Sequence, residues 1–304
     1  MMESEGCEKR RGMRMLYALN KVIDIYNFNP ANAGAARKYL ADEIFSKTAS
    51  STAATVTCVG HAHIDVGWFW PVRESIRKSA RTFATQLALM DKYSDYVFGA
   101  SQAELYMMVK ENYPALYERI REKVKEGRWE IQGGMWVEAD CNLSSGESLV
   151  RQVQYGKNFF RDEFGKETKT LLLPDVFGYS AALPQILKKS GVDYFVTSKI
   201  SWNDTNTLPV DTFMWEGIDG TNIFTSFITA RNALKNHDFG RVSTYVGKIN
   251  ASYAIGAWDR FQQKDYGNHV LLTFGFGDGG GGPNYQMLES ARRLQNFPGL
   301  PRLE

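Results

Sequence analysis

Short apolar segments alternate with longer amphipathic segments from about residue 54 to residue 294, and this alternation constrains the fold more than any other feature. The apolar segments are rich in β-branched or aromatic residues, as expected of buried strands. The amphipathic segments carry apolar residues at helical spacing. Strands that alternate with helices form a mostly parallel sheet with the helices outside it. The sequence therefore predicts an α/β fold, either a mostly parallel sheet or a distorted (β/α) barrel of about seven strands.

The same patterns give the bounds of the predicted elements. Strands are expected at residues 54–59, 96–101, 128–132, 170–173, 194–197 and 269–274, with a hairpin over 214–216 and 222–228. Helices are expected at 74–92, 103–126, 145–164, 182–189, 242–261 and 284–294. Pro114 is expected to kink the second of these helices. Ser145 is expected to cap the third, and Gly165 to end it.

The N-terminal part of the chain differs from the rest. Residues 13–47 read as helical in two pieces, broken at residues 27–30, and no strand is predicted there. A chain of 304 residues with 43% hydrophobic residues can bury a large core. We therefore expect a short helical segment over residues 1–50 and an α/β domain over residues 51–304.

Charge and cysteine content exclude several classes of partner. The 36 basic and 34 acidic residues leave a net charge of +2, with the two signs mixed along the chain. This balance favours neither a nucleic acid nor a membrane surface as partner, and no apolar run is long enough to span a bilayer. The three cysteines are far apart and form no CxxC pair. We expect a cytoplasmic protein, and the sequence leaves a homo-oligomer open.

Two histidines and an aspartate follow the first predicted strand directly. His61, His63 and Asp65 alternate in sequence, so on an extended chain they point to the same side. Imidazole and carboxylate groups at this spacing suit a borderline-soft divalent metal, zinc first. An exposed polar strand end is the alternative. The other histidines, His237 and His269, read as incidental.

Two further aspartates lie at predicted strand ends, where parallel sheets collect their chemistry. Asp175 follows the strand at 170–173 in a turn flanked by proline and glycine, and suits a metal ligand, a nucleophile or a base. Asp278 opens the glycine run at 279–282 and suits a general acid. A turn or cap residue is the alternative for each. The run lacks the Lys-Ser/Thr of a phosphate-binding loop.

Aromatic and charged residues beside these motifs are candidate substrate contacts. Trp68 lies just behind the histidine motif, and aromatic faces stack on sugars as well as building cores. Trp136 and Asp140 repeat the pairing of an aromatic ring with a carboxylate after the strand at 128–132. Lys199 ends the strand at 194–197, where it either offsets the carboxylates or is solvated.

Together these motifs resemble glycoside hydrolase family 38, the zinc-dependent retaining α-mannosidases, most closely the cytosolic and bacterial branch. The resemblance rests on four stretches in family order: residues 59–68 (VGHAHIDVGW), 127–140 (GRWEIQGGMWVEAD), 173–180 (LPDVFGYS) and 275–283 (GFGDGGGGP). It implies hydrolysis of terminal α-linked mannose from glycans, and makes residues 51–304 a catalytic domain.

The resemblance also implies roles for the strand-end residues. His63 and Asp65 would hold Zn²⁺, with His61 behind them. Asp175 would be both zinc ligand and nucleophile, and Asp278 the general acid/base. Retention of configuration needs two such carboxyl groups roughly 5 Å apart, one attacking the anomeric carbon and one protonating the leaving oxygen.

Substrate contacts carry over in the same way. Trp68 would pack against the bound mannose with Phe177 nearby, and Lys199 lies where related enzymes carry a basic residue close to the nucleophile. Family members normally take a fourth zinc ligand from a histidine well beyond the glycine-rich loop, and this sequence stops before that region. The chain therefore resembles a truncated catalytic domain, and we expect low or absent activity. A metal-dependent amidohydrolase or deacetylase, and a mannose-binding remnant without catalysis, are the alternatives.

Overall fold

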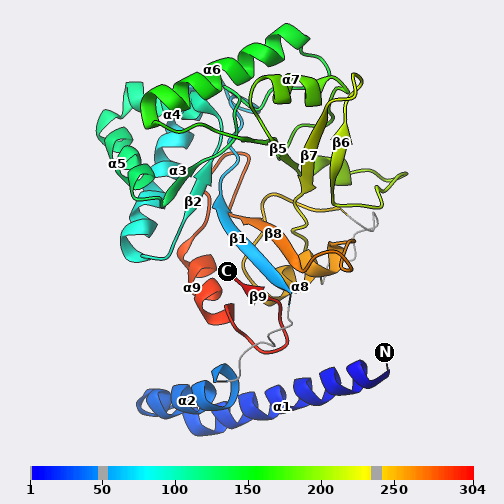
Figure 1. Ribbon diagram of the computed structural model, residues 1–304. Coiled ribbons are helices and arrows are strands. Elements are labelled where there is room, and N and C mark those ends of the chain that lie inside the picture. The colour runs from blue at the N-terminus through cyan, green and yellow to red at the C-terminus, as the bar shows by residue number, and fades with distance from the viewer. Residues whose placement is uncertain (1, 47–53, 234–241) are drawn as a thin grey trace.

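The structure is a computed structural model that describes residues 2–46, 54–233 and 242–304. Helix α1 (Met2–Tyr26) is followed by a 3-10 turn, η1 (Pro30–Asn32), then by helix α2 (Ala33–Leu40) and a π-helical turn, η2 (Ala41–Phe45). The break predicted at residues 27–30 is confirmed. α1 and α2 pack on each other beneath the α/β body (Figure 1). Within the described residues, no helix combines the length and the apolar character that a membrane span requires.

One sheet of five strands is parallel at every pairing. Its strands are β1 (Thr55–His61), β2 (Phe98–Ala100), β3 (Trp129–Ile131), β8 (His269–Phe274) and β9 (Arg302–Leu303). The order is β3-β2-β1-β8, and β9 pairs with the first residues of β1. The register sets Gly60 at the end of β1 opposite Phe274 at the end of β8. The two strands therefore end side by side, and the residues that follow them begin at the same edge of the sheet (Figure 1).

A second sheet has four strands in the order β4-β5-β7-β6. Its members are β4 (Thr170–Leu172), β5 (Tyr194–Thr197), β6 (Thr212–Glu216) and β7 (Asn222–Phe227). β4, β5 and β7 are parallel, and β6 pairs antiparallel with β7 as the predicted hairpin. Residues 244–247 link the two sheets, because Thr244 N–H donates to Ala230 and Gly247 N–H donates to Thr273. The predicted mostly parallel fold is confirmed, but it is divided between two sheets.

Helices cover the outside of both sheets (Figure 1). They are α3 (Val72–Lys92), α4 (Ala103–Asn112), α5 (Pro114–Lys125), α6 (Gly146–Phe164), α7 (Leu183–Lys189), α8 (Ala251–Arg260) and α9 (Tyr285–Leu294), with a 3-10 turn, η3 (Lys199–Ser201), after β5. Both predicted ends of α6 are confirmed. The hydroxyl of Ser145 accepts the Ser148 N–H at 3.2 Å, and Gly165 has φ 64 in the left-handed region.

Two predicted helices differ from the structure. The single kinked helix over 103–126 is two helices, because Pro114 has no N–H to continue the first and instead begins the second. The helix predicted over 242–261 begins only at Ala251, where the side chain of Asn250 accepts the Tyr253 N–H. His269 opens β8 as predicted, whereas His237 lies outside the described residues.

Candidate active site

Side chains that follow the C-terminal ends of β1, β3, β4, β5 and β8 line a cavity of about 600 Å³. All the predicted site residues except Trp136 line it, namely His63, Asp65, Trp68, Asp140, Asp175, Phe177, Lys199 and Asp278. Trp136 instead packs edge-on against the ring of Phe159, with ring centres 5.8 Å apart. The fold therefore brings together motifs that are more than two hundred residues apart (His63 and Asp278), at the ends of parallel strands.

The end of β1 places His63 and Asp65 side by side. His63 is 3% exposed, and its Nε2 lies 3.2 Å from Asp65 Oδ1 and 3.5 Å from Asp175 Oδ2. The backbone fixes this arrangement, because Asp65 N–H donates to the Asp278 carbonyl at 2.8 Å. His61 does not join the group: its Nδ1 lies 3.1 Å from the Gly99 carbonyl. Burial, with His63 nearby, lowers the pKa of His61 to about 4, so this ring is neutral near pH 7.

Asp175 follows β4 and makes an ion pair with Lys199. Lys199 Nζ lies 2.6 Å from Asp175 Oδ1, and both side chains are largely buried. The same ammonium lies 3.9 Å from the ring centre of Trp202, whose indole N–H donates to the Ser243 carbonyl. Lys199, which follows β5, therefore balances part of the carboxylate charge in the cavity.

Asp278 is oriented by Tyr245, a residue of the segment that links the two sheets. The Tyr245 hydroxyl lies 3.0 Å from Asp278 Oδ1, and its ring packs edge-on against His63. Burial and the carboxylates of Asp175 and Asp278 raise the pKa of Tyr245, so the hydroxyl stays protonated and donates. Asp278 also has φ 58, a left-handed conformation rare outside glycine.

The donor atoms around His63 fit a small divalent cation. Ligand atoms of His63, Asp175 and Asp278 all lie within 4.8 Å of one another. Asp65, which is predicted as a ligand, contacts His63 Nε2 but is not a member of this group of three. Asp278, which is predicted as the acid, is a member. Two ligands on a tetrahedral Zn²⁺ with bonds near 2.05 Å lie about 3.3 Å apart. The 3.2 and 3.5 Å separations from His63 Nε2 match this spacing.

The protonation of His63 is coupled to the carboxylates beside it. Burial alone would lower the pKa of His63, but Glu138 and Asp65 outweigh it and hold the pKa well above its usual value. Without a cation, the imidazolium balances part of the negative charge of these carboxylates. A metal ion at Nε2 must displace that proton, so metal binding and proton release are linked.

Two exposed aromatic rings lie at the rim of the cavity. Trp68 is 54% exposed and stacks with Phe69 at 4.2 Å, and Phe177 is 79% exposed. Both are available to the apolar face of a ligand. Asp140 lines the cavity, but its Oδ1 accepts the N–H groups of Asn142 and Leu143, so it also closes its own turn.

The sequence interpretation missed several residues of the site. Glu138 lies against His63 Nδ1, Gln102 braces the ends of β1 and β3, and Tyr245 and Trp202 orient the charged residues. Glu138 lies within the motif at 127–140, so its position offered a signal. Tyr245 offers none, because the sequence pattern predicts a helix over residues 242–261.

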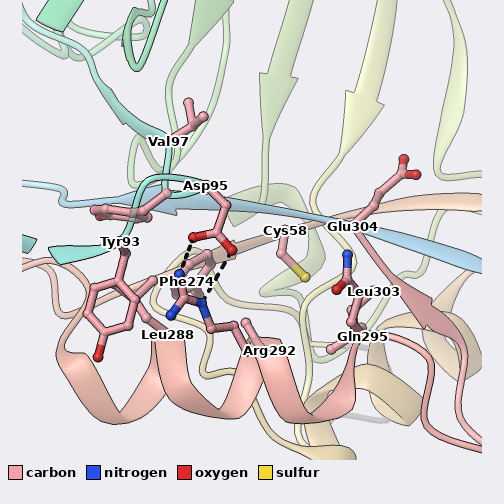
Figure 2. A pocket seen from close by; sticks show the side chains of 12 residues that line it. Cys58, Tyr93, Asp95, Val97, Phe274, Leu288, Arg292, Gln295, Leu303 and Glu304 are labelled. Atoms are coloured by element: carbon pink, nitrogen blue, oxygen red, sulfur yellow. Dashed lines mark hydrogen bonds and ion pairs between the residues drawn. The ribbon is translucent and has the colours of Figure 1, made fainter. Parts of the chain in front are cut away.

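A second, smaller hollow lies away from these residues (Figure 2). Its volume is about 250 Å³, and it lies beside β1 and β9, with Cys58 and Glu304 in its wall. Asp95 and Arg292 form a 2.7 Å ion pair there. No predicted site residue lines it, so the candidate chemistry belongs to the larger cavity.

Comparison of the sequence with known proteins gives matches over nearly its whole length. Residues 53–304 match the Glycosyl hydrolases family 38 N-terminal domain. Alpha-mannosidase G of Dictyostelium discoideum is 41% identical over 298 residues, which cover 98% of this chain and 26% of that protein. Human Alpha-mannosidase 2C1 is 38% identical over 299 residues, covering 98% and 28%. The chain thus spans about a quarter of the length of these relatives.

Solved structures support the fold. The crystal structure of an alpha-mannosidase from Enterococcus faecalis has a TM-score of 0.61 and 20% identity, covering 79% of this chain and 26% of that one. The 4-alpha-glucanotransferase of Thermococcus litoralis has a TM-score of 0.52 and 13% identity, covering 82% and 37%.

Proposed function

This chain belongs to glycosyl hydrolase family 38, and from that premise we propose that its cavity hydrolyses terminal α-linked mannose by a zinc-dependent retaining mechanism. The observation that carries the proposal is the convergence of Asp175, Asp278 and His63, whose ligand atoms lie within 4.8 Å. Two carboxyl groups at this separation suit retention rather than inversion, which needs room for a water between them. The names of the relatives supply the substrate class.

Four residues would hold or surround the cation. His63, Asp65 and Asp175 are the proposed ligands, and Asp278 lies within reach of the same position. When bound, Zn²⁺ would supply a Lewis acid for two neighbouring sugar hydroxyls and balance the carboxylate charge. An α-mannoside carries its axial O2 cis to O3, so one cation suits both. The mixed nitrogen and oxygen donors favour zinc over magnesium or calcium.

The chain's own residues would perform the two chemical steps. An oxygen of Asp175 attacks the anomeric carbon while Asp278 gives its proton to the leaving oxygen, which forms a covalent glycosyl–enzyme. Asp278 then takes a proton from water, and that water releases the sugar from Asp175. Tyr245 holds Asp278 in place through its 3.0 Å hydrogen bond, and Lys199 orients Asp175.

We further propose that residues 51–304 form the catalytic unit and that the chain alone turns over slowly. Trp68 and Phe177 are largely uncovered at the rim, and the chain spans only about a quarter of its relatives' length. Weak enclosure of a sugar lowers the binding energy available to the transition state. A cytoplasmic location and self-association stay predictions of the sequence.

Release of an aryl leaving group from an aryl α-mannoside tests the function. We expect turnover that requires added zinc, stops with a chelator and is abolished in Asp175→Asn. Turnover that persists in Asp175→Asn would refute the assignment of the nucleophile. Mannose binding without turnover in a zinc-loaded, folded sample would favour a binding remnant. Hydrolysis of an N-acetyl substrate instead would favour the amidohydrolase alternative.

A further inference from the structure

The side of His63 that faces away from the cavity is occupied by a buried carboxylate. Both oxygens of Glu138 lie 3.1 Å from His63 Nδ1, and the Glu138 side chain is only 6% exposed. Nε2, on the other side of the ring, faces Asp65 and Asp175. Because the two ring nitrogens point in different directions, Glu138 cannot share a cation bound at Nε2.

Glu138 is itself held by two polar residues at the end of β2. The Ser101 hydroxyl donates to Glu138 Oε1 at 3.2 Å, and the backbone N–H of Glu138 donates to Gln102 Oε1 at 3.2 Å. The amide nitrogen of the same Gln102 donates to the Ile64 carbonyl at 2.9 Å, between His63 and Asp65. One side chain therefore ties the Glu138 loop to the histidine motif.

The backbone of Gln102 is strained where it makes this tie. Its φ of 66 and ψ of 96 lie in a region that residues with a Cβ seldom adopt, and the residue is 3% exposed. Such a conformation is unfavourable and persists where the surrounding structure over-determines it, often at functional sites. The two hydrogen bonds to different loops supply that constraint here.

We propose that Glu138, braced by Gln102, is a positioning residue of the metal centre. Its carboxylate accepts a charge-assisted hydrogen bond from His63 Nδ1–H and so keeps Nε2 turned to the cavity. The inference rests on the proposed metal-dependent function and adds a residue outside its ligand set. A carboxylate on the second nitrogen of a metal-bound histidine fixes the ring's tautomer and orientation, and its loss weakens metal affinity about 10- to 100-fold.

The test measures the dissociation constant of Zn²⁺ alone, by competition with a chelating dye. The wild-type protein is compared with Glu138→Gln, which keeps the size of the side chain and removes its charge. Glu130→Gln, at an exposed glutamate on β3, is the matched control. We expect a dissociation constant at least about 10-fold higher in Glu138→Gln and no change in Glu130→Gln.

Each outcome decides between the inference and the function on which it rests. Wild-type binding matched by Glu138→Gln would overturn the positioning role and leave the proposed function intact. Failure of the wild type to bind zinc would remove both. If Glu138→Gln does not fold, judged by its urea midpoint, Ser101→Ala replaces it. That variant removes only the hydroxyl bond to Glu138 and is expected to weaken zinc several-fold without unfolding the chain, and unchanged affinity there would also refute the role.

Discussion

Replacing Gly156 by alanine tests how closely α6 must approach the loop that carries Glu138. Gly156 is buried on α6, and a Cβ added there would lie 2.4 Å from the Gly134 carbonyl oxygen and 2.5 Å from the Met135 carbonyl carbon. Both obstacles are backbone atoms, so no side-chain rotation relieves the clash. The same approach brings Gln152 on α6 within 2.9 Å of the N–H of Trp136, as a hydrogen-bond acceptor.

The change in unfolding free energy should have the opposite sign to that of a glycine-to-alanine substitution in an ordinary helix. Alanine in place of glycine in a helix interior favours folding by about 1 kcal/mol. Here the loop must retreat by roughly 1 Å to reach normal contact distances, and overpacking of this kind costs about 1–3 kcal/mol. The retreat also stretches the two hydrogen bonds that Gln152 accepts from the N–H groups of Trp136 and Val137, each worth about 1 kcal/mol. We expect a net loss of about 2–4 kcal/mol in unfolding free energy.

Urea unfolding followed by circular dichroism measures this loss. Gly146→Ala, in the first turn of the same helix, is the matched control, because no atom lies within 4 Å of its added Cβ. We expect the control to range from no change to about 1 kcal/mol of stabilisation. If Gly156→Ala were as stable as the wild type, the close packing of α6 on the loop would not constrain the site, and the reasoning would fail.

Three further predictions follow from buried charges and thiols. Because the pKa of His63 is raised and its Nε2 proton competes with the metal, zinc affinity should fall about tenfold per pH unit below that pKa; an affinity independent of pH in titration calorimetry would contradict this. Burial raises the pKa of Cys58 and of Cys141 to about 12. In a Cys7→Ser protein at pH 8, both thiols should therefore react with a disulfide reagent roughly a thousandfold more slowly than after unfolding, and fast labelling of the folded form would refute it. Asp211→Ala removes the carboxylate from a fully buried ion pair with arginine and should cost about 3–5 kcal/mol in urea; a loss below 1 kcal/mol would show that the pair is dispensable.

Local rules were sufficient for much of the fold. Ser145 and Gly165 mark the ends of α6 because capping and left-handed termination act over three or four residues. The same reasoning placed Pro114 at a helix disturbance but not at a complete break. The sequence predicts a helix over residues 242–261, yet residues 244 and 247 bond to Ala230, which follows β7 of one sheet, and to Thr273 on β8 of the other. A local pattern carries no information about such distant partners.

In the candidate site, too, local sequence patterns predict some features, whereas others depend on contacts between distant residues. The convergence of His63 and Asp278 could be predicted, because they follow parallel strands that end at one edge of a sheet. Asp175 follows β4 of the second sheet, so its approach to them depends on how the two sheets are joined. Which nitrogen of His63 faces Asp65 and Asp175 could not be predicted, since that depends on Glu138 at the other nitrogen and on the hydrogen bonds of Gln102. Trp136, chosen by its motif, faces Phe159, because a three-residue strand alone does not set the direction of the loop after it.

Two residues at the site adopt positive φ although neither is glycine, and their placement explains how the site stays rigid. Gln102 follows β2 and Asp278 follows β8, and each bonds to the residues just after β1: Gln102 through its side chain to Ile64, Asp278 through its carbonyl to the N–H of Asp65. The residues after β1 are therefore hydrogen-bonded to the residues that follow both neighbouring strands. Backbone strain of about 1–3 kcal/mol at Gln102 and at Asp278 has to be outweighed by these bonds. Because β2 and β8 flank β1 on opposite sides, a sideways movement of His63 and Asp65 stretches the hydrogen bond to Gln102 or the one to Asp278.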